Sequence, residues 1–363
     1  MQYKVKIVDK WPGYAREYCG FWKRLTQNFD VVWSEEPDYL FYDVYEPFEH
    51  ALDSRYDRCV KIFWTGENVV PDFRACDYAI AFEYSSDPRN LRWPLYVMYL
   101  DWLESLVRPK NLWVADSRVA DPRVVDSRVV DPRVVDFRTP AVYGASAEDI
   151  RTYASAHAPA SAPAIPAYNT HLTASARLLL ASKTKFCNFV YSDPVPQERV
   201  KFFKLLSRYK RVDSGGDVEN NLGYKVANKR KFISEYKFTI AFENSLRDGY
   251  VTEKIVEPLS VYSVPIYRGS SRITEEFNSG CFVNTHEFPN LEAVVDKVIE
   301  LDQDDSLYAR YLESPCFANN EPNIYCRLDY LTSFLAKIFN DRAPRSAKER
   351  RTCMVNSSWK AYL

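Results

Sequence analysis

Residues 236–269 read YKFTIAFENSLRDGYVTEKIVEPLSVYSVPIYRG, and the prediction of the fold starts from this segment. The apolar runs at 238–242 and 264–267 predict two strands, and a polar loop with Asp248 and Gly249 follows the first of them. Between loop and second strand, Thr252 is placed to cap a helix whose first turn carries Glu253 and Lys254. The unit has about the size of one β-α-β crossover, which places the loop and the helix N-terminus at the carboxyl edge of a parallel sheet.

The N-terminus of this predicted helix is a candidate anion site. Free backbone N–H groups and the helix dipole favour an anion there, typically a phosphate, and Lys254 adds a mobile positive charge. The alternative is an ordinary capped helix with solvated Glu253 and Lys254 side chains, and spacing alone leaves both interpretations open. The chain has no G-x-x-x-x-G-K sequence, so a P-loop nucleotidase is disfavoured.

The first hundred residues alternate short apolar runs with a helical pattern. Strands are predicted at 3–8, 31–33, 39–42, 58–64 and 78–82, and a helix is predicted at 18–28. This alternation indicates an open α/β sheet. Glu67 directly follows the strand at 58–64, in a loop where Gly66 permits close approach of the backbone to a ligand. Catalytic groups concentrate at such strand ends, although a glutamate in this position is also a common turn residue.

A second α/β series follows, with a predicted strand at 185–191 and an amphipathic helix at 198–209 whose first turn carries Arg199. Gly215 and Gly216 lie in the next loop, and another helix is predicted at 291–301. Two such series indicate two α/β domains, which a chain of 363 residues is long enough to form.

Several of these motifs together resemble the α-1,3-fucosyltransferase family. FENS, GYVTEKI and VPIYRG are similar to its donor-binding motif, and SGG at 214–216 and SGCFVNTHEF at 279–288 continue the match. IFWTGENVVPDF, DYAIAFEY and LRWPLY are similar to its N-terminal domain. The resemblance covers roughly 1–100 and 183–335. It implies a GT-B type fold, in which two Rossmann-like α/β domains face each other across a cleft, and inverting transfer of fucose from GDP-fucose.

The resemblance also implies roles for individual residues. Glu67 matches the general base, and Glu253 matches a carboxylate on the fucose side. The residues that match donor-binding positions are Arg199, Gly215, Gly216, Asn244, Tyr250 and Lys254, with Arg199 and Lys254 as the phosphate partners. Two residues depart from the family pattern. Pro258 lies inside the predicted helix, where it should kink or shorten it, and Arg268 stands where the family has an aromatic residue.

A period-five repeat, DSRVA-DPRVV-DSRVV-DPRVV-DFR at 116–138, interrupts the family pattern. Its alternate prolines exclude a continuous helix, and its charges favour a solvated insertion over a β-solenoid. An Ala/Pro/Ser-rich linker at 141–167 follows it. We therefore expect an acceptor-side domain at 1–110, the insertion and linker at 111–180, a GDP-sugar-binding domain at 181–340 and a basic tail at 341–363.

Composition excludes several classes of protein. The formal net charge of −1 points to neither nucleic acid nor a membrane surface. The eight cysteines form no C-x-x-C pair and none has zinc-ligand spacing beside a histidine, so we expect buried free thiols and no metal site. No run of about 18 apolar residues and no signal-peptide core occurs, which predicts a chain without a transmembrane segment, of the soluble microbial or viral type and cytoplasmic.

The expected function is therefore transfer of fucose from GDP-fucose to an oligosaccharide or glycoconjugate hydroxyl, α-1,3 to N-acetylglucosamine or glucose. No cofactor is expected to be obligate, although a divalent cation could stimulate the reaction. Two alternatives stay open: a transferase that uses another GDP-sugar, and a catalytically silent glycan-binding homologue. A phosphoryl transferase is disfavoured because aspartate clusters that hold catalytic Mg²⁺ are not evident.

Overall fold

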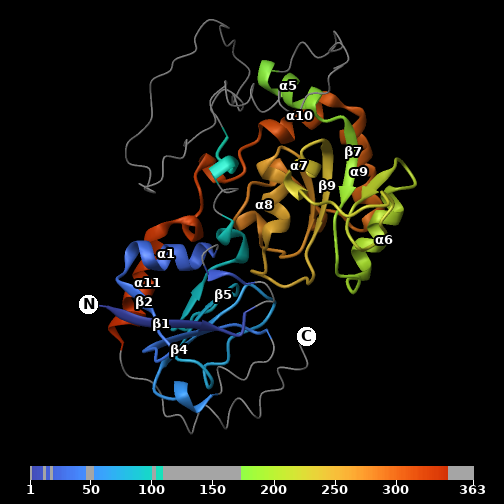
Figure 1. Cartoon of the computed structure of the whole chain (residues 1–363). Coiled ribbons are helices and arrows are strands. Elements are labelled where there is room, and N and C mark those ends of the chain that lie inside the picture. Colours follow the sequence, from blue (N-terminus) through green and yellow to red (C-terminus); the bar gives the residue numbers. More distant parts are fainter. Residues whose placement is uncertain are drawn as a thin grey trace, which may run out of the picture.

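The computed structural model describes residues 2–10, 14–16, 19–45, 53–99, 104–108 and 173–341. These residues form two parallel α/β domains, one from each half of the chain (Figure 1). The predicted repeat at 116–138 and the linker at 141–167 lie outside the described residues, as does the predicted tail beyond Asp341.

The N-terminal domain contains a six-stranded sheet with the order β2-β1-β3-β4-β5-β6, in which every described pair of neighbours is parallel. Its strands are β1 Tyr3–Val8, β2 Val31–Trp33, β3 Tyr39–Tyr42, β4 Val60–Trp64, β5 Tyr78–Ala81 and β6 Asn90–Arg92. Every residue of β3 and β5 is buried, which explains why these strands read as short continuous apolar runs. The predicted strands are confirmed, whereas the three-residue β6 was not predicted.

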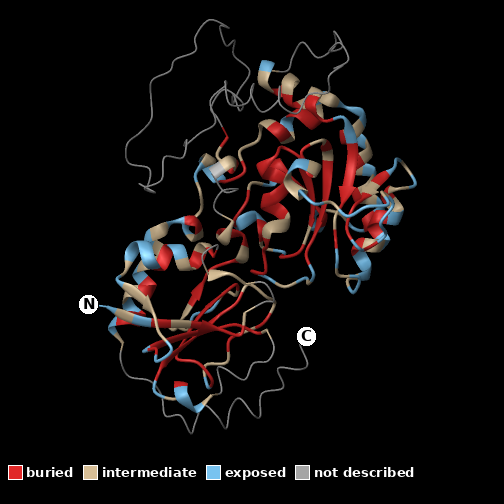
Figure 2. Ribbon diagram, in the orientation of Figure 1, coloured by how far each residue is buried: buried red, intermediate tan, exposed pale blue. Residues whose placement is uncertain are grey.

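The C-terminal domain contains a second parallel sheet, with the order β11-β10-β9-β7-β8. Its strands are β7 Lys185–Phe189, β8 Val212–Ser214, β9 Tyr236–Phe242, β10 Val264–Arg268 and β11 Val283–Asn284. Its helices are α5 Ala174–Ser182, α6 Gln197–Leu206, α7 Lys229–Ile233, α8 Glu253–Ser260, α9 Leu291–Gln303 and α10 Asp305–Glu313. Most strand residues of both sheets are buried (Figure 2), whereas the three residues of the edge strand β2 are half-buried.

The strand-loop-helix-strand unit predicted from residues 236–269 is confirmed as β9, α8 and β10. Thr252 is the N-cap of α8, and its side chain accepts a hydrogen bond from the backbone N–H of Lys254. Pro258 lies inside α8, and the helix continues for only two residues beyond it. The helix is therefore short, as expected for a proline that removes a backbone donor.

The two domains are in contact through the apolar side of α8. Ile255 and Leu259 of this helix belong to the same core cluster as Trp93 and Tyr96 of the N-terminal domain. The cluster also contains Phe21 and Leu25 of α1, so α1 and α8 pack into the same core as the N-terminal sheet. Helix α1 spans Gly20–Asn28, close to the predicted range 18–28. A shared apolar core therefore joins the two domains.

The last helix, α11 Leu328–Asn340, returns to the N-terminal domain and lies beside α1 and β2 (Figure 1). The ring of Phe339 stacks on Tyr3 at a centroid distance of 4.5 Å, and its backbone carbonyl accepts a hydrogen bond of 2.7 Å from the Tyr39 hydroxyl. Chain order alone assigns residues 328–340 to the C-terminal domain. The contacts show instead that this helix completes the packing of the N-terminal sheet.

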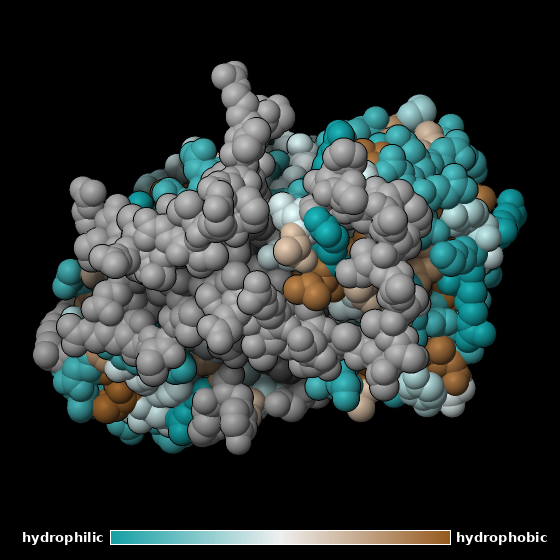
Figure 3. Space-filling model, turned by 90° about the horizontal axis from the view of Figure 1, so that it is seen from above, coloured by the Kyte–Doolittle hydropathy of each residue, from teal (hydrophilic) through white to brown (hydrophobic). Residues whose placement is uncertain are grey.

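The described surface is largely hydrophilic on the face seen in Figure 3, with single apolar residues scattered over it. In the described ranges, no helix has the length and apolarity needed to span a bilayer. The seven cysteines within these ranges are buried free thiols, as predicted.

Candidate active site

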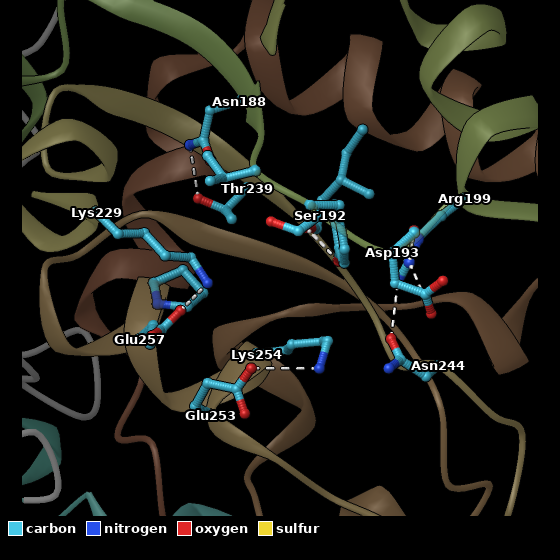
Figure 4. A pocket seen from close by; sticks show the side chains of 14 residues that line it. Asn188, Ser192, Asp193, Arg199, Lys229, Thr239, Asn244, Glu253, Lys254 and Glu257 are labelled. Atoms are coloured by element: carbon cyan, nitrogen blue, oxygen red, sulfur yellow. Dashed lines mark hydrogen bonds and ion pairs between the residues drawn. The ribbon is translucent and has the colours of Figure 1, made fainter. Parts of the chain in front are cut away.

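A cavity of about 200 Å³ opens at the carboxyl edge of the C-terminal sheet, between the ends of β7 and β9 and the first turns of α6 and α8 (Figure 4). Four of the residues predicted from the sequence line it: Arg199, Asn244, Glu253 and Lys254. The other polar side chains that line it include Asn188, Tyr191, Asp193, Lys229 and Glu257. The cavity therefore coincides with the predicted anion site at the N-terminus of α8.

Lys254 is held between two carboxylates. Its Nζ lies 3.3 Å from Glu253 and 3.4 Å from Glu243, and it donates to the Thr252 hydroxyl at 3.2 Å. Burial alone would lower the pKa of Lys254, but the two carboxylates outweigh it and raise this pKa well above its usual value. Burial raises the pKa of Glu253, and Lys254 and Lys229 outweigh that effect, so it is lowered. Both groups are thus charged at neutral pH.

Arg199 is almost fully buried under the cavity, with 1% of its surface exposed. One terminal nitrogen donates to the Asn244 side chain at 2.8 Å, and the other donates to the backbone carbonyl of Asp193. Its guanidinium lies 4.2 Å from the centroid of the Tyr191 ring, and burial lowers its pKa. Its Nε has no hydrogen-bond partner among the described residues, and the Asp193 carboxylate lies 3.5 Å from one terminal nitrogen.

Glu243 is a residue that sequence reasoning passed over, although it is part of the FENS motif. Its carboxylate is buried, and it accepts hydrogen bonds from Thr252 and faces Lys254. A second missed group is the ion pair between Lys229 of α7 and Glu257 of α8, which lies at the edge of the cavity. The apolar neighbours of Glu257 in sequence gave no signal for a partner on another helix.

Tyr250 lies beside the cavity, at the contact between the domains. Its ring packs edge-on against Phe82 of the N-terminal domain at 5.4 Å. Burial raises the pKa of the Tyr250 phenol, and the negative charges of Glu243 and Glu67 act in the same direction. The preceding residue, Gly249, has a φ of +85°, and a Cβ on it would stand 2.6 Å from the Phe82 carbonyl oxygen. Glycine is required there for conformation and for space.

Gly215 and Gly216 do not line the cavity. A Cβ on Gly216 would stand 2.1 Å from the carbonyl oxygen of Tyr191, and one on Gly215 would stand 2.4 Å from Val226. The glycines let the loop after β8 pack closely against the chain that follows β7. There the Tyr191 carbonyl accepts hydrogen bonds from the backbone N–H groups of Asp217 and Val218. The structure gives them a packing role, and their contact with a donor stays a prediction.

Glu67 lies on the N-terminal domain, in the loop after β4, where it is half-buried. Its side chain accepts a hydrogen bond from the Tyr45 hydroxyl, and its backbone N–H donates to the Thr65 hydroxyl at 3.0 Å. Burial raises the pKa of Tyr99, and the charges of Glu253 and Glu67 raise it further. Tyr99 thus experiences the charges of carboxylates from both domains. The role of Glu67 as the base stays a prediction.

No group of three or more His, Cys, Asp and Glu side chains suited to a metal ion occurs within the described ranges. The basic side chains that line the cavity are those of Arg199, Lys229 and Lys254.

Two α/β domains with parallel sheets, one of which carries a cavity lined by basic side chains, are consistent with a fold of the GT-B type, the architecture of nucleotide-sugar glycosyltransferases. The family model for the α-(1,3)-fucosyltransferase FucT N-terminal domain matches residues 5–99. The model for the C-terminal part of glycosyltransferase family 10 (fucosyltransferase) matches residues 180–315. The chain belongs to this fucosyltransferase family, which confirms the resemblance predicted from its motifs.

Individual proteins similar to this chain are also fucosyltransferases. The chain is 32% identical over 280 residues to α-(1,3)-fucosyltransferase FucT of Helicobacter pylori, a match that covers 76% of this chain and 51% of that protein. It is 35% identical over 132 residues to GDP-fucose protein O-fucosyltransferase 3 of Homo sapiens, covering 33% of this chain and 27% of that protein. The chain thus spans about half, or less, of the length of these relatives.

A crystal structure of an α1,3-fucosyltransferase with GDP-fucose superimposes with a TM-score of 0.65 at 23% identity, covering 94% of this chain and 91% of that one. This similarity confirms the fold.

Proposed function

We propose that this protein transfers L-fucose from GDP-fucose to a glycan hydroxyl with inversion, α-1,3 to N-acetylglucosamine or glucose. The observation that carries the proposal is the cavity at the start of α8, where Arg199 and Lys254 converge. Glu67 of the other domain supplies the carboxylate that the acceptor needs.

The donor side supplies positive charge where negative charge develops. As fucose leaves, the diphosphate of GDP gains charge, and pre-oriented cations stabilise it without reorganisation. Lys254 is held in place by Thr252, Glu253 and Glu243, and Arg199 is held by Asn244. The dipole of α8 adds partial positive charge at the N-terminus of the helix. These groups bind the diphosphate, and Asn244 and Tyr250 contact the donor from the same loop.

The acceptor side supplies the base. The acceptor oxygen forms a bond to the anomeric carbon while the bond from that carbon to the β-phosphate oxygen breaks, and the acceptor proton moves to the Glu67 carboxylate. The anomeric carbon becomes positively charged on the way, as in glycoside hydrolysis, and a neighbouring carboxylate stabilises it. Glu253, charged at neutral pH, takes this role from the first turn of α8.

The comparisons support this donor and linkage. The Helicobacter pylori relative is named an α-(1,3)-fucosyltransferase, and the solved α1,3-fucosyltransferase was crystallised with GDP-fucose. We further propose that residues 1–110 form the acceptor side and 181–340 bind the GDP-sugar, with α11 contributing structurally to the acceptor side.

The test is a donor panel. Purified full-length protein is incubated with GDP-fucose, GDP-mannose and UDP-galactose, each with and without N-acetyllactosamine or lactose, and GDP or UDP release is measured. We expect release from GDP-fucose to exceed that from the other donors at least tenfold and to rise with acceptor, and NMR of the product should show fucose on O3. Preference for GDP-mannose would identify a different GDP-sugar transferase. Glycan binding without turnover of any donor would identify a silent homologue.

A further inference from the structure

A buried charged cluster outside the cavity joins the two domains. Arg92, the last residue of β6, donates to Glu276 of the C-terminal domain at 2.7 Å, and only 5% and 1% of their side chains are exposed. The Tyr96 hydroxyl donates to the other carboxylate oxygen of Glu276 at 2.7 Å. The guanidinium of Arg92 lies 4.3 Å from the ring centroids of both Tyr84 and Tyr325. The guanidinium thus lies between the two rings, and its Nε and one terminal nitrogen have no hydrogen-bond partner among the described residues.

The same nitrogen of Arg92 reaches the loop that leads into α8. It donates to the backbone carbonyl of Gly249 at 3.1 Å, and the Gly249 N–H donates to the Ser270 hydroxyl at 3.1 Å. The loop between β9 and α8 is thus attached in its middle to the N-terminal domain. At its two ends it is attached within its own domain, where Glu243 binds Thr252.

The attachment at Gly249 fixes the position of the neighbouring residue, Tyr250. The Tyr250 ring packs on Phe82 of the N-terminal domain, and its phenol experiences the charge of Glu67. A loop released at Gly249 would let Tyr250 move away from Phe82. The cavity lining would change little, because neither Gly249 nor Tyr250 belongs to it.

We propose that Arg92 is a positioning residue, which binds Glu276 and the Gly249 carbonyl. It thereby holds the loop between β9 and α8, the donor loop, with Tyr250 against Phe82 of the domain that carries Glu67. The inference rests on the proposed function, since it concerns the alignment of the donor with the base. Arg92 acts across the interface, so its loss affects transfer more than donor binding.

The test uses the double variant Arg92→Met/Glu276→Gln, which removes the guanidinium without leaving a buried carboxylate unpaired. We expect kcat for GDP-fucose transfer to fall 10- to 100-fold and the Kd of GDP to stay within threefold. Amide exchange of residues 244–252 should become at least tenfold faster, while that of α9 is unchanged. The control is Tyr39→Phe, which removes a buried contact to α11 remote from the loop. It should leave all three quantities within twofold of the parent protein.

If the double variant does not fold, the single variant Arg92→Lys tests the role of Arg92. Lysine keeps the charge beside Glu276, but its shorter side chain lacks the planar group that stacks between the two tyrosines. We expect a smaller loss of kcat, about three- to tenfold, with faster exchange of the loop. Exchange and kcat like those of Tyr39→Phe would overturn the inference. If the parent protein transfers no fucose, the proposed function fails, and the exchange rate of the loop still tests the role of Arg92.

Discussion

The buried carboxylate of Glu243 accepts two hydrogen bonds from Thr252, one from its backbone N–H at 2.8 Å and one from its hydroxyl at 2.7 Å. Glu243 directly follows β9, and Thr252 is the N-cap of α8. The pair therefore closes the loop between them and fixes where the helix begins. Since Lys254 lies 3.4 Å from the same carboxylate, the position of the cation depends on it as well.

Glu243→Ala should destabilise the protein by about 2–4 kcal/mol, because it leaves the buried N–H and hydroxyl of Thr252 without their acceptor. Urea unfolding of the purified variant measures this change. The control is Glu300→Ala on α9, an exposed residue paired with Lys297, which should cost no more than about 0.5 kcal/mol. If Glu243→Ala and the parent protein unfolded at the same urea concentration and with the same denaturant slope, the role assigned to Glu243 would be contradicted.

Arg199→Ala and Lys254→Ala should each weaken GDP binding by about 1.5–3 kcal/mol, the usual cost of a lost charge-assisted hydrogen bond. Titration calorimetry with GDP measures both. Lys201→Ala, a change of an exposed lysine on the same helix as Arg199, is the matched control and should leave the affinity unchanged. Unaltered GDP affinity in both variants would remove the nucleotide from this cavity.

Glu67→Gln should reduce transfer by about 10²–10⁴-fold, the usual contribution of a general base, while GDP affinity stays the same. Glutamine keeps the size of the side chain and can still accept from Tyr45, but it cannot take the acceptor proton. Glu253→Gln should have a different effect, because a carboxylate next to fucose acts on the donor. In this variant the rates of GDP-fucose hydrolysis and of fucose transfer should fall together. Parallel losses of GDP binding and transfer in Glu67→Gln would show that Glu67 is not the base.

The stability of the protein should depend on Lys183 in a pH-dependent way. Burial, with a smaller effect of Arg108, lowers the pKa of Lys183 to about 7, and its Nζ donates to the carbonyls of Ser234 and Val261 at 2.6 Å each. In the unfolded chain a lysine titrates near pH 10.4. Between pH 7 and 10 the unfolded state therefore binds more protons, so the contribution of Lys183 to stability rises with pH in this window.

Urea unfolding of the parent protein and of Lys183→Met at pH 7, 8 and 9 tests this dependence. The stability difference should shift in favour of the parent protein as the pH rises, by at most about 1.4 kcal/mol per pH unit. Ile338→Val, which removes a buried methyl group and no charge, should give a difference that is independent of pH. A difference that is constant or shrinks for Lys183→Met would show that this lysine stays charged in the folded protein.

Transfer should not require a divalent metal ion, because Arg199 and Lys254 provide positive charge at the diphosphate. Adding EDTA to the assay should leave the rate within twofold of its value without chelator. Mn²⁺ and Mg²⁺ should then stimulate moderately or not at all. Complete loss with EDTA and recovery with Mn²⁺ would show that a metal ion carries part of the charge.

The strands and the crossover at 236–269 could be located from the sequence because each of these patterns is local. The residues that converge on the cavity were predicted from the resemblance to the family. Apolar periodicity marks a buried strand, and Thr252 marks a helix start whatever the remainder of the chain does. The motif residues Arg199, Asn244, Glu253 and Lys254 come together because the carboxyl ends of parallel strands meet at one edge of a sheet.

Contacts between residues far apart in the sequence are known only from the tertiary structure. Tyr39 and Phe339 are 300 residues apart, and Arg92 and Glu276 are 184 apart. A periodic pattern encodes which face of an element is buried but not which partner covers it, so neither the return of α11 to the first sheet nor the link from Arg92 to the donor loop could be predicted. Glu243 illustrates the same limit, because only folding buries its carboxylate against Thr252 and makes a motif residue into the support of the helix.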